Sequence, residues 1–154
     1  MNLGQLLALF IGRACLSAIF ILSGVRKILS WHGSLDFAHS TLAKWQVSLL
    51  DMPLPRSILD MMVAYLPLLL GLALFLELSG GLLILIGIKP RLGGALLLLF
   101  LIPTTALFHP FWLFTGDQQS FEMVMFMKNI AITGGLLCLL AIPSRRPYAP
   151  PHGK

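Results

Sequence analysis

The sequence predicts an all-α integral membrane protein, a four-helix bundle with an interfacial amphipathic segment between the first and second transmembrane helices. Hydrophobic residues make up 57% of the 154 residues and charged residues only 11%, less than half the roughly 25% found in soluble domains. Four apolar runs are about 20 residues long, the length at which a helix crosses about 30 Å of hydrocarbon. The runs and their short connections suit a single transmembrane domain.

The four expected spans end at charged residues, prolines or turn residues. They cover residues 6–29, 62–88, 92–111 and 121–142, followed by a short polar tail over residues 143–154. The second span is longer than a bilayer requires, so we expect it to tilt or to begin at the interface before Pro67. Cys15 and Cys138 fall within apolar spans and are expected to be buried thiols.

The segment over residues 30–60 is polar and mixed, with aromatic residues spaced among charged ones. We expect a short amphipathic helix near residues 35–50, ended by Pro53 and Pro55. Such a helix would lie on the membrane and partly cap the bundle.

Basic residues predict the orientation and the localisation. The turn from Lys89 to Arg91 and the C-terminal tail are basic, whereas the loop over residues 115–120 carries only Asp117. The positive-inside rule therefore places both termini in the cytoplasm of a bacterial inner membrane, although Arg26 and Lys27 at the far end of the first span argue against this. The net charge of +5 is scattered over helix ends, so we expect contacts with membrane lipids and no nucleic-acid binding.

Three ionisable side chains, Arg13, Glu77 and Lys128, lie well inside the apolar spans. A charge near the bilayer centre costs about 2.5 to 3.5 kcal/mol on insertion scales, so such a residue normally pairs inside a bundle or lines a polar pathway. Arg13 lies about 10 Å, and Glu77 about 16 Å, from the cytoplasmic ends of their spans. We therefore expect an ion pair between Arg13 and Glu77. The pair either fixes the helix register, or Glu77 exchanges a proton, or the pair binds a polar head group.

A second group of polar residues is expected in the outer half of the bundle. Lys128 and Asn129 lie about 10 to 12 Å below the outer end of the fourth span, with Glu122 one to two turns above them, and His109 lies near the end of the third span. We expect these residues to share a pocket with Lys27 and Trp31, where an imidazole could change its charge near neutral pH. The alternative is that His109 is a simple hydrogen-bonding residue near an interface.

Four short motifs are distributed over about residues 10 to 140. They are Gly12-Arg13 through Phe20-Ile-Leu-Ser-Gly24-Val-Arg-Lys27, Glu77-Leu-Ser-Gly80-Gly81 with Leu85-Ile-Gly87 and Arg91, Phe108-His109, and Met127-Lys128-Asn129-Ile-Ala. In combination they resemble the signatures of the DoxX family of small bacterial membrane proteins. The resemblance implies a four-helix inner-membrane protein related to the quinone-linked small subunits of thiosulfate oxidation and to proteins acting in oxidative or quinone stress. It singles out Arg13, Lys27, Glu77, His109, Lys128 and Asn129.

The first expected function is a redox-linked subunit that binds a quinone or a similar lipophilic ligand inside the bundle. Glu77 and His109 are assigned catalytic roles in proton movement and hydrogen bonding, and the ligand-binding residues are Arg13, Lys27, Lys128 and Asn129. Donors and an acid in an apolar cavity are what a lipophilic head group requires. The sequence contains no motif for a metal, flavin, haem or iron–sulfur cofactor, so a quinone-linked oxidoreductase subunit would need a partner oxidoreductase to supply electrons.

The alternative function is a non-catalytic membrane scaffold or assembly subunit. In that case the buried charges secure the bundle, and the segment over residues 30–60 recruits the partner oxidoreductase. Transport is a third class of function, but carriers usually have more spans or repeated halves. Only a homo-oligomer would make transport plausible.

Overall fold

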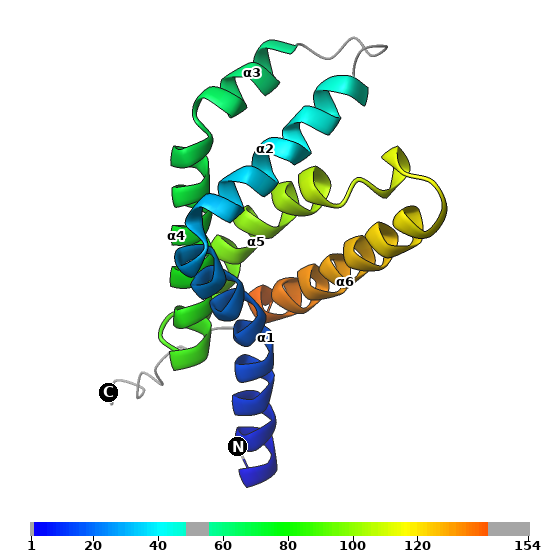
Figure 1. Ribbon diagram of the computed structural model, residues 1–154. Coiled ribbons are helices and arrows are strands. Elements are labelled where there is room, and N and C mark those ends of the chain that lie inside the picture. The colour runs from blue at the N-terminus through cyan, green and yellow to red at the C-terminus, as the bar shows by residue number, and fades with distance from the viewer. Residues whose placement is uncertain (1, 49–55, 142–154) are drawn as a thin grey trace, which may run out of the picture.

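The computed structural model describes residues 2–48 and 56–141, and every regular element in these ranges is a helix (Figure 1). The four long helices of the expected bundle are present, and each is long and apolar enough to cross a membrane. In chain order the elements are α1 (Leu3–Leu29), α2 (Trp31–Ser48), α3 (Arg56–Ala64), α4 (Leu66–Ile86), α5 (Pro90–Phe108), the 3-10 helix η1 (Phe111–Leu113) and α6 (Gly116–Ala141). The predicted polar tail lies outside the described residues.

The second span begins later than the sequence predicted, at Leu66 instead of residue 62. Pro67 has no backbone N–H to donate, so it is best tolerated in the first turn of a helix. A helix therefore ends at Ala64 and a new one begins at Leu66. The apolar residues before Tyr65 belong to α3 rather than to the membrane span.

Close backbone contact holds α4 against α5. An added Cβ on Gly93 would lie 2.7 Å from the carbonyl oxygen of Gly80, and one on Gly80 would lie 2.9 Å from the carbonyl oxygen of Gly93. In lipid the hydrophobic effect contributes little to helix association, so close packing over small residues stabilises the contact instead. The turn between the two helices is tight because Gly87 and Lys89 both have positive φ, at 81° and 49°.

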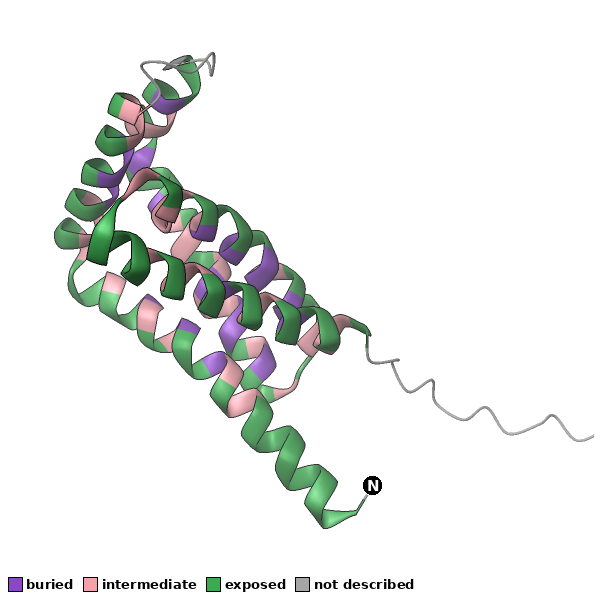
Figure 2. Ribbon diagram, turned by 90° about the vertical axis from the view of Figure 1, so that its right-hand side faces the viewer, coloured by how far each residue is buried: buried purple, intermediate pink, exposed green. Residues whose placement is uncertain are grey.

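The main core lies where α1, α4, α5 and α6 cross, and most of the outward surface is exposed (Figure 2). Its buried hydrophobic residues are Phe20, Ile84, Leu97, Leu98, Phe100, Leu101 and Leu136. Many large apolar side chains are exposed on the outside, as expected where lipid replaces water. Cys15 and Cys138 are also exposed, so the expectation of buried thiols is wrong.

A second cluster joins α2 and α3 to the ends of α4 and α5. Ala38 and Leu42 of α2 are buried against Leu59 and Leu66, with Leu107 and Phe108 packed at the edge. The helix expected near residues 35–50 therefore exists, begins at Trp31 and covers one end of the bundle. Pro53 and Pro55, which were expected to end it, lie outside the described residues.

Candidate functional site

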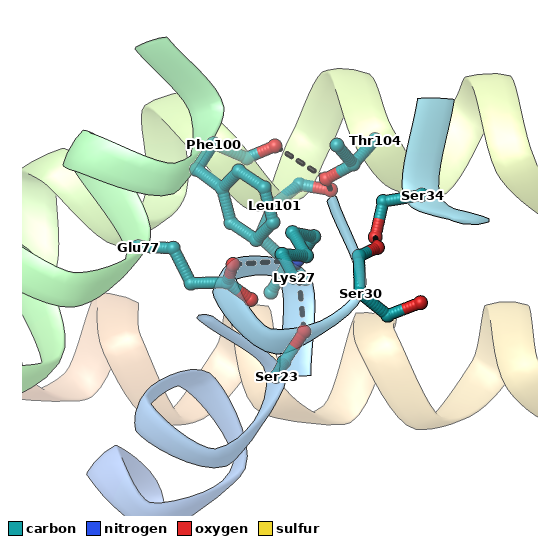
Figure 3. A network of polar contacts seen from close by, with 8 residues as sticks. All are labelled: Ser23, Lys27, Ser30, Ser34, Glu77, Phe100, Leu101 and Thr104. Atoms are coloured by element: carbon teal, nitrogen blue, oxygen red, sulfur yellow. Dashed lines mark hydrogen bonds and ion pairs between the residues drawn. The ribbon is translucent and has the colours of Figure 1, made fainter. Parts of the chain in front are cut away.

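An ion pair between Lys27 of α1 and Glu77 of α4 lies inside the bundle (Figure 3). Glu77 is 1% exposed, and its Oε2 accepts a hydrogen bond from Lys27 Nζ at 2.5 Å. Lys27 Nζ also donates to Ser23 Oγ at 2.9 Å and lies 5.2 Å from the ring centroid of Phe100. Because the ammonium satisfies the buried carboxylate, much of the desolvation cost of both groups is offset.

The predicted ion pair between Arg13 and Glu77 is wrong. The guanidinium of Arg13 lies against Gly87, where its Nη1 occupies the space that a side chain on Gly87 would need. Gly87 is ten residues beyond Glu77, about 15 Å along α4. The depth estimate failed because the first turns of α1, residues 2–12, are exposed and extend beyond the bundle (Figure 2). That offset moves Arg13 to the C-terminal end of α4.

The Arg13 guanidinium lies at the C-terminal end of α4. Its Nε is buried and has no hydrogen-bond partner in the structure. The last carbonyls of α4 carry partial negative charge, and a cation at a helix C-terminus is stabilised by it. Arg13 therefore complements the end of α4, and the structure does not bring it together with the other predicted site residues.

A second ion pair joins His109 at the C-cap of α5 to Glu122 of α6. His109 Nδ1 lies 2.8 Å from Glu122 Oε2, and the two side chains are 25% and 15% exposed. Sequence reasoning placed His109 and Glu122 in one group of polar residues but did not predict that they pair directly. The pairing could have been predicted from the length of the connection between α5 and α6. A short connection makes the two helices antiparallel, so residues at similar distances from the connection lie at similar depths in the membrane.

Next to this pair is a small hollow with four aromatic side chains in its lining, which we call the aromatic hollow. Its free volume is about 30 Å³. The rings of Phe37 and Phe108 stack in its wall with centroids 5.7 Å apart and planes inclined by 16°. Trp45 Nε1 donates to the carbonyl oxygen of Leu107 at 2.8 Å, which fixes α2 against α5. The lining residues are Phe37, Thr41, Lys44, Trp45, Phe108, Pro110, Leu113, Phe114 and Glu122.

Lys128 and Asn129 do not join the residues with which they were expected to form a pocket. Lys128 is exposed on α6, and its Nζ lies 3.3 Å from Met125 Sδ on the same helix. Asn129 is buried, on the face of α6 that also buries Leu136. Of the six predicted site residues, the structure joins only Lys27 and Glu77 directly, while His109 lies at a separate ion pair.

Comparison with known proteins agrees with the helical architecture. The sequence model of the DoxX family matches residues 8–110. The chain is 29% identical over 134 residues to the inner membrane protein YphA of Escherichia coli strain K12, a match that covers 87% of this chain and 81% of that protein. No significant match was found among solved structures.

Proposed function

This chain belongs to the DoxX family of multi-pass membrane proteins, and from that premise we propose that it is a redox-linked subunit of the bacterial inner membrane that binds a quinone or a similar lipophilic ligand. We place the ligand head group at the aromatic hollow, beside the ion pair of His109 and Glu122. The observation that carries the proposal is the combination of a stacked aromatic wall and an adjacent, partly buried imidazole–carboxylate pair. Apolar walls with a few placed polar groups are typical of sites for small lipophilic ligands.

The quinone head group binds between the stacked rings of Phe37 and Phe108 by displacing one of them. The free space of about 30 Å³ holds one water molecule rather than a quinone ring. Phe37 is 59% exposed, so its ring can rotate outward and a planar head group can take its place against Phe108. Offset stacking of this kind contributes about 0.5 to 1.5 kcal/mol beyond the area that is buried.

Polar groups around the hollow suit the carbonyl oxygens of a quinone. Reduction of a quinone to a quinol takes up two electrons and two protons, with one proton on each oxygen. Glu122 and Lys44 line the hollow. In the proposed site His109, which pairs with Glu122, donates a hydrogen bond to one oxygen and Lys44 donates to the other. The electrons come from a redox centre on a partner oxidoreductase, while Glu77 remains paired with Lys27.

The test is quinone binding by the purified protein and two variants. The wild type should retain quinone through gentle solubilisation, and quinone analogues should raise its melting temperature. Phe37→Leu and His109→Gln should each weaken that shift. Phe75→Leu is the matched control, because Phe75 is an exposed aromatic residue on α4. A wild-type protein that neither retains quinone nor responds to analogues would contradict the proposal.

The second candidate is a non-catalytic scaffold or assembly subunit that recruits a partner oxidoreductase. The observation in its favour is that Lys27 and Glu77 satisfy each other inside the bundle, which is what a purely structural pair requires. The scaffold function predicts that His109→Gln yields a stable protein that recovers the same partners with unchanged efficiency. Loss of quinone-dependent activity in that variant, with recovery of the partners unchanged, favours the first function.

A further inference from the structure

Lys128 lies at the middle of α6 and faces outward. It follows Gly116 by twelve residues and precedes Ala141 by thirteen, so each end of the helix is about 18 to 20 Å away. Its side chain is exposed and lies against the sulfur of Met125. Neither ion pair found among the described residues involves Lys128.

A cation at this depth is unfavourable in contact with lipid. Lysine near the end of a span can extend its ammonium to the interface. The apolar part of α6 begins at Phe121, so Lys128 lies about 10 Å inside it, where a charge still favours a polar partner. Charged residues within spans normally face a bundle interior or pair with an opposite charge. Because Lys128 does neither within residues 2–48 and 56–141, we look for its partner outside that part of the chain.

The exposed residues around Lys128 form a continuous stripe along α6. Steps of three, four, three and four residues place them on one helical face. A Cβ added to Gly135 would meet only Leu16 of α1, at 3.8 Å, and α1 and α6 diverge from that level toward the start of α6 (Figure 1). The residues of this Lys128 stripe are Phe121, Val124, Lys128, Ala131 and Gly135, all of them exposed.

A second copy of this chain does not suit the stripe. A two-fold pair across it would bring Lys128 to the same depth as its own copy, and the two like charges would repel each other. Nor do the residues that the structure describes offer an exposed carboxylate at that depth. Glu77 is 1% exposed and Glu122 is paired with His109, while the other four acidic residues lie in the 30–60 segment or in the first turn of α6.

We propose that the Lys128 stripe is the docking surface for a transmembrane helix of a partner protein that carries an aspartate or glutamate near the middle of its span. The carboxylate pairs with Lys128, and the small residues Ala131 and Gly135 let the partner helix approach closely. This surface is separate from the aromatic hollow, and the proposal does not depend on quinone binding. It identifies the face of the molecule through which a membrane partner is held.

The first experiment is site-specific photo-crosslinking in native membranes. A benzophenone amino acid replaces Ala131 on the stripe, and in the control it replaces Leu137, which is 53% exposed on the opposite flank of α6. We expect a discrete adduct with a second membrane protein from position 131 and none from position 137. Mass spectrometry should map the adduct to a transmembrane segment that contains an acidic residue. Adducts of the chain with itself, or with lipid alone, would overturn the proposal.

The second experiment tests the charge pair. Lys128→Met should lower the adduct yield at least tenfold, Lys128→Arg should retain it, and replacement of the partner's carboxylate by an amide should reproduce the loss. Val124→Trp, which keeps the lysine but blocks the stripe, should also lower the yield. An unchanged yield in Lys128→Met would refute the ion pair. The quinone-induced melting shift should stay at the wild-type value in Lys128→Met, which separates this proposal from the proposed function.

Discussion

Lys27 of α1 lies 2.5 Å from the carboxylate of Glu77 on α4, and Glu77 is 1% exposed. Polar groups around the pair are also satisfied, since Ser23 accepts a hydrogen bond from the ammonium and Thr104 donates to the carbonyl oxygen of Phe100 at 2.5 Å (Figure 3). One charge–charge contact therefore links α1 to α4 beside α5. Removing the Lys27 charge alone leaves the buried Glu77 carboxylate without its partner.

Lys27→Met should strongly destabilise the bundle. The variant leaves the Glu77 carboxylate buried and unpaired, and breaking a buried pair on one side typically costs about 3 to 5 kcal/mol. The double variant Lys27→Met, Glu77→Met should recover most of that loss, because it removes both charges. Equilibrium unfolding of the solubilised protein measures both effects.

Arg26→Met is the matched control for this experiment, because Arg26 is an exposed cation on the adjacent residue of the same helix. Its free energy of unfolding should stay within about 0.5 kcal/mol of the wild type. Equal losses in Lys27→Met and Arg26→Met would show that the ion pair does not hold the helices together.

Most of the fold could be predicted from the sequence, because hydropathy marks the membrane spans and helix-breaking residues such as proline mark where helices end. Four apolar runs of sufficient length predicted four spans, and their limits were correct to within about five residues. The start of the second span shows one cause of the difference. There the apolar residues before Tyr65 extended the predicted span, although Pro67 in the first turn of α4 separates them from it. Hydropathy alone does not distinguish a short apolar helix from the start of a span.

The partners of the charged residues could not be predicted in the same way. Glu77 pairs with Lys27 rather than Arg13 because α1 is displaced along α4, and small-residue contacts set that displacement. Gly24 packs on Leu78, and Gly81 packs on Ile21. Which face of α6 points inward was equally hidden, because lipid-facing and core-facing residues are similarly apolar. The outward position of Lys128 thus became visible only in the structure.

Gly93→Ala should destabilise the protein by about 1 to 3 kcal/mol, as overpacking typically does. The added Cβ would lie 2.7 Å from the backbone carbonyl oxygen of Gly80, which cannot move without shifting α4. Gly134→Ala is the control, because a Cβ there meets no atom within 4 Å. The free energy of unfolding of Gly134→Ala should be unchanged or raised by up to about 1 kcal/mol, since alanine is the better helix former. Thermal unfolding measures both variants, and a destabilised Gly134→Ala would argue against the packing described for α6.

Gly87→Ala and Arg13→Ala should show strongly non-additive effects on stability. Gly87 has a φ of 81°, and a side chain there would collide with the Arg13 guanidinium. Gly87→Ala should therefore cost about 1 to 3 kcal/mol, whereas Arg13→Ala should cost about 0.3 to 1 kcal/mol by removing a cation from the C-terminus of α4. In a double-mutant cycle, the double variant should lose less stability than the sum of the losses of the two single variants, because the collision disappears when Arg13 is alanine. Strict additivity would mean that the two residues do not touch.

The predicted orientation can be tested by labelling single cysteines on intact cells. We expect the turn between α4 and α5 to face the cytoplasm, because Lys89 and Arg91 flank it. The contrary signal at the end of α1 is weaker than its sequence suggests, since Lys27 is neutralised by Glu77 and only Arg26 remains exposed there. In a background with Cys15→Ser and Cys138→Ser, a membrane-impermeant maleimide should label Asp117→Cys and leave Ile88→Cys unlabelled until the cells are broken. The reverse labelling pattern would place both termini on the outer side.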